Sequence, residues 1–241
     1  MKPLVSVVIP CFNEQENVPR LWEKVAAVFA TLPDYEYEIL FVNDGSSDGT
    51  RAAMDALAAQ DPHVRPLHLV RNMGQSAAVY AGMMRSRGDY VLTLDGDLQN
   101  DPADFPRFLE LLQRYDCVCG YRAERHDALV RKVSSKVANA VRNWALRDGV
   151  RDSGCGAKGF RRACLVHLPP FNGLHRFMAV FIRAAGLSLV EAPVRHHARQ
   201  FGVSKYGIGN RLWRGIYDLI GVRWLRRRFV AVRVEGEEPR V

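Results

Sequence analysis

The chain has 241 residues, of which 48% are hydrophobic and 25% charged, so it can bury one substantial core and does not have the composition of a disordered protein. Its five cysteines include no Cys-x-x-Cys pair, which argues against a disulfide framework or a zinc knuckle and favours a reducing cytosol. We expect neither a signal peptide nor a membrane-spanning helix, because no segment reaches ~18 consecutive apolar residues.

Charge is distributed unevenly along the chain. Residues 1–120 carry 10 Lys and Arg against 17 Asp and Glu, a net charge of −7, whereas residues 121–241 carry 24 against 9, a net charge of +15. This asymmetry suggests an acidic half that handles a metal and a basic half that meets anions. A lipid phosphate, a membrane surface or a nucleic acid would each suit the basic half, and composition alone does not choose among them.

Strand and helix patterns alternate through the first hundred residues. Apolar, β-branched runs predict four strands, and apolar residues at helical spacing predict a helix after each of the first three. This rhythm predicts an α/β protein with a parallel, doubly wound sheet whose ligands bind beyond the carboxyl ends of the strands. The predicted strands are 4–10, 37–42, 64–70 and 90–94, and the predicted helices are 17–30, 51–60 and 74–86.

The second half departs from this alternation. A long helix is predicted over 130–147, with an apolar stripe and basic flanks, and a glycine-rich turn over 153–159. Cys117 and Cys119 alternate along a predicted strand, and we expect at most one of them to face the core. The remaining predicted elements are helices at 104–115 and 177–185, strands at 116–120 and 187–193, and a basic aromatic tail from Tyr206.

Two carboxylates directly follow the fourth predicted strand. Asp95 and Asp97 are one residue apart, so both can reach one hard divalent cation, and Mg²⁺ often takes one or two carboxylates together with substrate phosphates. Such a metal would neutralise a diphosphate leaving group. An Asp-x-Asp pair alone is also compatible with a solvated turn, and its place after a strand of the alternating pattern favours the metal site.

Further polar turns follow the other strands. Asp44, after the second strand, is placed to accept hydrogen bonds from a nucleobase or ribose, whereas Asp48 is expected mainly to cap the next helix. The turns containing Asn13 and Gly74 follow the first and third strands. We expect all four turns to leave the same edge of the sheet and to form one pocket.

The motifs VVIPCFNE, VNDGSSDGT, RNMG and DGDLQNDP occur in this order and resemble glycosyltransferase family 2, which has the GT-A fold. The DLQNDP form is similar to the polyprenyl-phosphate branch of that family, typified by dolichyl-phosphate mannose synthase. RDSGCGAKGFRR and ARQFGVSKYG resemble later segments of the same branch, so the resemblance spans roughly residues 4–210. It implies a catalytic domain over 1–210, with a nucleotide-sugar and metal half (1–100) and an acceptor half (101–210), followed by a membrane-associating tail over 211–241.

The resemblance also implies roles for individual residues. Asp152 falls on the family's acidic residue near the sugar, and Lys158 stands where many relatives have Arg. A segment around His175 also fits the family, but no role for it follows from the sequence. The implied metal ligands are Asp95, Asp97 and Gln99; the implied nucleotide-sugar site is Pro10, Asn13, Glu14, Asp44, Gly74 and Asp95; Arg199, Ser204 and Lys205 would close over the diphosphate or the incoming phosphate; and Arg122, Arg125 and Arg131 would face the acceptor.

The implied reaction moves a sugar from a UDP- or GDP-linked donor to a polyprenyl phosphate, with Mg²⁺ or Mn²⁺. We expect single-displacement inversion, since no second carboxylate is evident as a nucleophile, with Asp152, Asp97, Arg199 and Lys205 as the catalytic group. Because a lipid phosphate is already anionic, catalysis would rest on positioning and on stabilising the diphosphate.

We expect peripheral association with the cytoplasmic membrane face through basic, aromatic C-terminal amphipathic helices. No nucleic-acid partner is expected, and a membrane partner protein or a second copy is left open.

Three alternatives are weighed against this interpretation. One is a family 2 transferase with a saccharide acceptor. A nucleotidyltransferase would share the sheet and the metal carboxylates, but it would normally show a glycine-rich phosphate loop near the first strand, which VVIPCFNE lacks. A basic membrane-binding adaptor would explain the tail and leave the acidic motifs unexplained.

Overall fold

The computed structural model describes residues 1–123, 140–197 and 209–230. Within these residues the backbone forms one sheet of seven strands, in the order β3-β2-β1-β4-β6-β5-β7. The strands are β1 (Leu4–Cys11), β2 (Glu36–Asn43), β3 (Val64–His68), β4 (Tyr90–Thr93), β5 (Cys117–Arg122), β6 (Lys158–Arg161) and β7 (Leu189–Val194).

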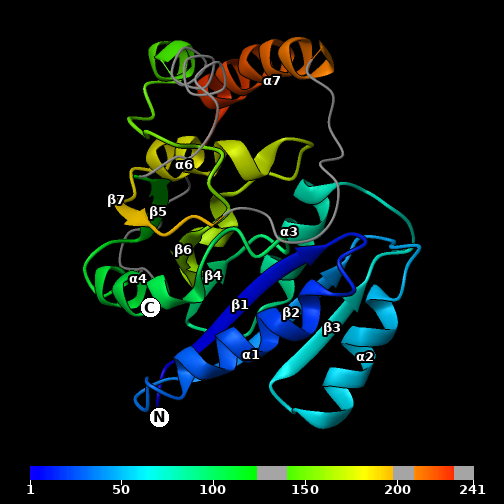
Figure 1. Cartoon of the computed structure of the whole chain (residues 1–241). Helices are drawn as coiled ribbons and strands as arrows, with labels where there is room; N and C mark the ends of the chain where they lie inside the picture. The colour runs from blue at the N-terminus through cyan, green and yellow to red at the C-terminus, as the bar shows by residue number, and fades with distance from the viewer. Residues whose placement is uncertain (124–139, 198–208, 231–241) are drawn as a thin grey trace.

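Helices cover both faces of this sheet (Figure 1). On one face α1, α2 and α4 pack on the core cluster that contains Val7 and Phe41, and on the other α3, α6 and α7 pack on the cluster that contains Val8 and Leu40. Neighbouring residues of a strand therefore bury into opposite layers, as the pleat of a β-strand requires. The helices are α1 (Asn17–Phe29), α2 (Thr50–Gln60), α3 (Gln75–Arg85), α4 (Phe105–Leu112), α6 (Leu174–Ala184) and α7 (Gly209–Arg228), with 3₁₀ turns η1 (Pro102–Asp104) and η2 (Arg162–His167) and a helical segment over 140–146.

The predicted parallel half of the sheet is confirmed. β1 pairs in parallel with both β2 and β4, and β2 pairs in parallel with β3. The near-continuous apolar run of β1 suits this central position, where both faces are covered by helices. The carboxyl ends of β1 to β4 consequently lie together at one edge of the sheet.

The second half contains a strand that the sequence did not reveal. β6 runs antiparallel to both β4 and β5, so the sheet is mixed. Residues 158–161 are Lys-Gly-Phe-Arg, and because Gly and Lys are depleted in strands, their sequence gave only a glycine-rich turn. β5 in turn pairs in parallel with β7 at the edge.

The expectation for Cys117 and Cys119 is wrong. Both side chains are fully buried, and their sulfur atoms lie 4.0 Å apart on the face covered by α6. Residues two apart in a strand point to the same side, so burial of one favours burial of the other.

The C-terminal helix α7 lies across α6 from the sheet, at the top of the view in Figure 1. Its Val222 is buried in the core cluster beside α6, so this part of the chain is docked on the domain. Among the residues that the model describes, no helix combines the length and apolar character needed to cross a bilayer. The predicted helix over 130–147 is described only from residue 140 onward.

Candidate nucleotide-sugar site

The four turns that follow β1 to β4 are joined to one another by hydrogen bonds. In the β1 turn, Asn13 donates its backbone N–H to Ser46 Oγ (3.0 Å) and accepts from the backbone N–H of Ser47 (2.8 Å) in the β2 turn. Gln75, at the start of α3 after the β3 turn, donates its side-chain amide to Asp95 Oδ1 (2.9 Å) after β4. This linkage gathers the predicted motifs at one edge of the sheet, as expected.

Asp44 is the centre of the link between the β2 and β3 turns. Its two carboxylate oxygens accept from the backbone N–H groups of Met73 (2.7 Å) and Gly74 (2.9 Å), and the residue is buried. Burial raises the pKa of this carboxyl group, whereas the two hydrogen bonds oppose the rise. Each oxygen keeps a second lone pair, so Asp44 can hold the turn and still accept a hydrogen bond from a ligand.

Special backbone conformations allow the turns to approach so closely. Gly45 has φ +67°, and a Cβ there would lie 2.4 Å from backbone atoms of Arg71 and Asn72. Asn13 is left-handed as well, with φ 56°, a conformation that Asn tolerates better than most residues. Gly45, the glycine of the NDG motif, therefore allows the β2 turn to pack closely against the β3 turn.

A cavity of about 160 Å³ opens beside Asp95. Its polar lining comes from both halves of the chain. Gln75 and Asp95 belong to the first half, Lys158 lies on β6, and His175 and Arg176 lie on α6. The other lining residues are Val79, Thr93, Gly154, Cys155, Gly156 and Met178. Gly156 packs directly on Asp95, since a Cβ there would lie 2.1 Å from Asp95 Oδ2.

Asp95 is electrostatically strained. Burial, followed by the negative charge of Asp97, raises its pKa from 3.8 to about 6, although Lys158, Arg122 and Gln75 oppose the rise. A bound cation would reverse this effect, and two carboxylates plus substrate phosphates are a set of oxygen ligands that Mg²⁺ accepts. The residues therefore fit a divalent ion that is completed by a phosphorylated ligand. Within the described ranges, no three His, Cys, Asp or Glu side chains are arranged to hold a metal.

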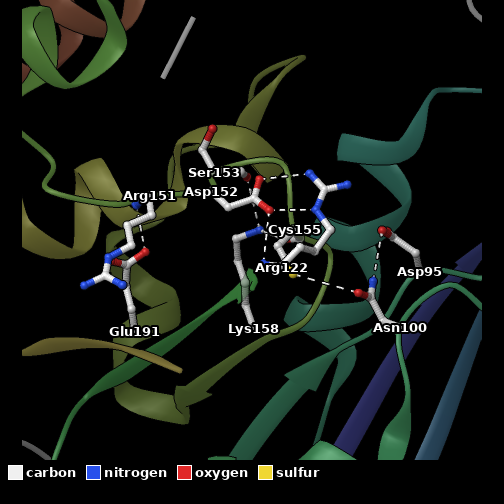
Figure 2. A network of polar contacts seen from close by, with 9 residues as sticks. All are labelled: Asp95, Asn100, Arg122, Arg151, Asp152, Ser153, Cys155, Lys158 and Glu191. Atoms are coloured by element: carbon white, nitrogen blue, oxygen red, sulfur yellow. Dashed lines mark hydrogen bonds and ion pairs between the residues drawn. The ribbon is translucent and has the colours of Figure 1, made fainter. Parts of the chain in front are cut away.

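Asp152 and Arg122 form a two-pronged ion pair above this site (Figure 2). Arg122 donates through Nε to Asp152 Oδ2 (2.6 Å) and through Nη2 to Asp152 Oδ1 (2.9 Å), and only 8% of the Asp152 side chain is exposed. Lys158, equally buried, donates to the carbonyl oxygen of Cys155 and, at 3.5 Å, to that of Ser153. The positive charges of Lys158 and Arg122 both favour the ionised form of Asp95 and so lower its pKa.

His175 is held in its neutral form. Burial, followed by the neighbouring charges of Arg176 and Lys158, lowers its pKa to about 3. Its Nδ1 lies 2.7 Å from Ser76 Oγ, which also accepts from the backbone N–H of Gly173. An uncharged imidazole on the cavity wall can recognise a polar group without adding charge.

The other predicted site residues lie in several places. Glu14 is buried and accepts from Asn17 Nδ2 (2.5 Å) at the start of α1, and the carbonyl of Pro10 lies against Gly96. Asp97 Oδ1 accepts from the backbone N–H of Gln99 (3.2 Å). Asp48 Oδ1 accepts from the backbone N–H and the hydroxyl of Thr50 at the start of α2, although the N-cap residue of that helix is Gly49 and not Asp48. Arg125, Arg131, Arg199, Ser204 and Lys205 lie outside the described residues.

Four cavity residues were not identified as site residues from the sequence. Gln75 directly follows the RNMG turn, so its place at the mouth of the predicted pocket was available as a signal. The sequence assigned no role to Lys158, His175 or Arg176. Lys158 is brought to Asp95 by the pairing of β6 with β4, and the other two are brought there by the packing of α6 on α3.

Comparison with known proteins identifies the family. The family model described as glycosyl transferase family 2 matches residues 6–167. Dodecaprenyl-phosphate galacturonate synthase of Rhizobium johnstonii is 38% identical over 229 residues, which cover 92% of this chain and 67% of that protein. Undecaprenyl-phosphate 4-deoxy-4-formamido-L-arabinose transferase of Sodalis glossinidius is 38% identical over 218 residues, 90% of this chain and 66% of that protein. The chain thus spans about two thirds of the length of these relatives.

Solved structures support the same fold at lower sequence identity. Glucosyl-3-phosphoglycerate synthase from Mycobacterium tuberculosis, in complex with Mn²⁺, UDP and glucosyl-3-phosphoglycerate, superposes with a TM-score of 0.70 at 19% identity over 97% of this chain and 82% of that one. The same enzyme with Mg²⁺ and UDP gives a TM-score of 0.68 at 18% identity, with the same coverage. At this identity the likeness shows the GT-A arrangement alone. The motif turns gathered around Asp95, the family match over most of the chain and the relatives at 38% identity agree, and this chain belongs to glycosyl transferase family 2.

Proposed function

We propose that this chain transfers a sugar from a nucleotide-sugar donor to a polyprenyl phosphate, with inversion at the anomeric carbon. The observation that carries the proposal is the cavity beside Asp95, where Gln75 and Asp95 from the motif turns face the cations Lys158 and Arg176. The relatives at 38% identity are polyprenyl-phosphate sugar transferases, which supports this acceptor.

The donor would lie along the edge formed by the turns. Asp44, with Asn13, Glu14 and Gly74 nearby, would meet the nucleoside, and the sugar would enter the cavity beside Asp95. Asp95 and Asp97, with Gln99, would hold Mg²⁺ or Mn²⁺, which when bound supplies positive charge to the departing diphosphate. The M. tuberculosis enzyme binds Mn²⁺ or Mg²⁺ with UDP on the same fold, which is consistent with this arrangement.

The reaction requires one bond to form and one to break. A phosphate oxygen of the acceptor attacks the anomeric carbon, the bond from that carbon to the diphosphate oxygen breaks, and the nucleoside diphosphate leaves with the electron pair. The acceptor phosphate is already ionised near neutral pH, so no general base is needed. The protein's contribution is to orient both reactants and to stabilise the charge that develops on the leaving group.

Arg122 and Asp152 supply orientation in this scheme. Both carboxylate oxygens of Asp152 accept hydrogen bonds from Arg122, so Asp152 fixes the guanidinium in one direction. Arg122 would then meet the acceptor phosphate, and Asp152 would act through it as a positioning residue. Arg125, Arg131, Arg199, Ser204 and Lys205 are proposed for the phosphate groups on the family resemblance alone.

We also propose that the enzyme works at the cytoplasmic face of a membrane, with residues 1–210 as the catalytic domain and 211–241 as a membrane-associating tail. A family 2 transferase with a saccharide acceptor remains the alternative, since the family includes such enzymes. A non-enzymatic adaptor does not account for the acidic turns, and the family assignment argues against it.

The test is a direct assay of product. The purified chain is incubated with UDP- and GDP-sugars, Mg²⁺ or Mn²⁺ and a polyprenyl phosphate, and glycolipid is detected by mass spectrometry. We expect one metal-dependent polyprenyl-phosphate sugar, its loss in Asp97→Asn, and its retention in Asp34→Asn, an exposed carboxylate changed in the same way. Donor hydrolysis without glycolipid would move the acceptor to a saccharide, and a product with retained configuration would refute the single displacement.

A further inference from the structure

Four arginines line a second hollow, remote in sequence from the motif turns. A cavity of about 480 Å³ between the helical segment 140–146 and α7 is lined by Trp144, Ala145, Arg147, Arg223, Arg226 and Arg227. Arg226 donates through Nη1 to the carbonyl oxygen of Leu146, which fixes α7 against the end of the segment. The other three guanidinium groups are not used in that contact.

The positive charge of this hollow is not balanced by the part of the chain that the structure describes. No ion pair with a described residue involves any of the four arginines, whereas Arg122, Arg142 and Arg176 elsewhere each pair with an aspartate. Bringing four like charges together costs free energy, which the contact of Arg226 and the place of Arg226 and Arg227 in the last turn of α7 offset only in part. A guanidinium group can donate two parallel hydrogen bonds to two oxygens of one phosphate group. An anionic phosphate is therefore the ligand best suited to these arginines.

Exposed apolar side chains stand beside the arginines. On α7, Tyr217, Ile220 and Trp224 are 74%, 63% and 63% exposed, and their spacing places them on one face of the helix, away from the buried Val222. Trp144, beside the hollow, is 77% exposed. Tryptophan and tyrosine next to basic residues are typical of side chains at a membrane–water interface.

We propose that the hollow lined by Arg147, Arg223, Arg226 and Arg227 binds the headgroup phosphate of an anionic phospholipid, while the exposed face of α7 enters the interfacial region of the bilayer. This site lies on α7 and the helical segment 140–146, on the far side of α6 from the sheet, and is separate from the cavity beside Asp95. It gives the proposed membrane association a defined ligand and does not depend on which acceptor the enzyme uses.

Sedimentation with vesicles tests this site without donor or acceptor, so failure of the transfer reaction would not affect the result. The full chain is mixed with vesicles of phosphatidylcholine alone or of an equal mixture of phosphatidylcholine and phosphatidylglycerol. We expect binding to the anionic vesicles only. The double variant Arg223→Gln/Arg227→Gln should weaken it by about 25-fold, since each basic residue at an anionic surface contributes ~1 kcal/mol. Arg226 is left in place because it holds α7.

Two comparison variants separate a pocket from general charge. Arg107→Gln/Arg114→Gln removes the same charge on or beside α4, on the opposite face of the sheet, and should change binding by less than about twofold. Arg223→Lys/Arg227→Lys keeps the charge but loses the paired guanidinium contacts, so its affinity should fall between those of the wild type and the Gln variant. Unchanged thermal unfolding in each variant would show that the fold is intact.

Three results would overturn the proposal: equal weakening by the α4 double variant, equal binding to neutral vesicles, or binding to a DNA or RNA duplex that depends on the same arginines while the vesicles are not bound. Stabilisation of the chain by inorganic phosphate through Arg223 and Arg227, without vesicle binding, would assign the hollow to a free anion and also refute a lipid site.

Discussion

Replacing Asp95 by asparagine is expected to stabilise the metal-free protein while abolishing transfer. Asp95 is held where its charged form is disfavoured, by burial and by the neighbouring Asp97. An amide of the same shape can still accept from Gln75 through its oxygen and carries no charge. The substitution therefore removes the electrostatic cost and keeps most of the packing.

The size of the effect follows from the pKa. The difference between 3.8 and about 6 corresponds to roughly 3 kcal/mol, because each pKa unit is worth about 1.4 kcal/mol. The Asp95 carboxyl group releases its proton near pH 4 in the unfolded chain and near pH 6 in the folded chain. The free energy of unfolding of the wild type therefore falls as the pH rises between those two values. Allowing for partial exposure of the side chain, we expect Asp95→Asn to be about 2 kcal/mol more stable than the wild type at pH 7.5.

Thermal unfolding measured from pH 4 to pH 8 in the presence of a chelator checks this prediction. A gain of about 2 kcal/mol raises Tm by roughly 4–8 °C in a protein of this size, and the two curves should converge near pH 4. Adding Mn²⁺ and UDP should stabilise the wild type and leave the variant unchanged. Asp34→Asn, at an exposed site, should follow the wild type throughout. A variant that is less stable than the wild type at pH 7.5, or a gain that does not depend on pH, would refute the reasoning.

Three further changes are expected to act through contacts described above. Arg122→Gln should cost about 3 kcal/mol in urea unfolding because it removes the charged, two-pronged partner of the buried carboxylate of Asp152, and adding Asp152→Asn should restore most of that loss. Gly45→Ala should destabilise by more than about 2 kcal/mol, since its Cβ would collide with a neighbouring turn; normal stability would contradict the assigned packing. Asp218→Asn breaks the 2.7 Å ion pair that ties α7 to Arg176 on the cavity wall, and should raise the KM for the donor several-fold with under ~1 kcal/mol lost in stability.

The part of the candidate site that residues 1–100 build could be predicted from the sequence because its signals are local. Each motif turn directly follows an apolar strand, and parallel strands place their carboxyl ends at a common edge. Asp44 and Asp95 therefore needed only the strand pattern to be brought to one site, and the hydrogen bonds at Gly74 and Gln75 confirm that placement.

The cationic wall of the cavity could not be derived in the same way. Lys158 reaches Asp95 only because β6 inserts between β4 and β5 in the opposite direction, and its Lys-Gly-Phe-Arg sequence has weak strand character. Arg176 reaches the cavity through the packing of α6 on α3, residues nearly a hundred positions apart. Long-range pairing of this kind leaves no periodic trace in the sequence.

The charge asymmetry of the chain now has a physical basis. The acidic half places Asp44, Asp95 and Asp97 where a cation and a donor would neutralise them, and cations from the basic half come to the same site from the opposite side. Those cations are constrained there: Arg122 is paired with a carboxylate, and Lys158 is buried against backbone carbonyls. Arg226 of the α7 hollow has a comparable contact with the carbonyl oxygen of Leu146, whereas Arg147, Arg223 and Arg227 have no such partner among the described residues, although they belong to the same basic half. A single anionic ligand in the catalytic site would not account for both groups, and this is why the excess positive charge is better explained by two anion sites than by one.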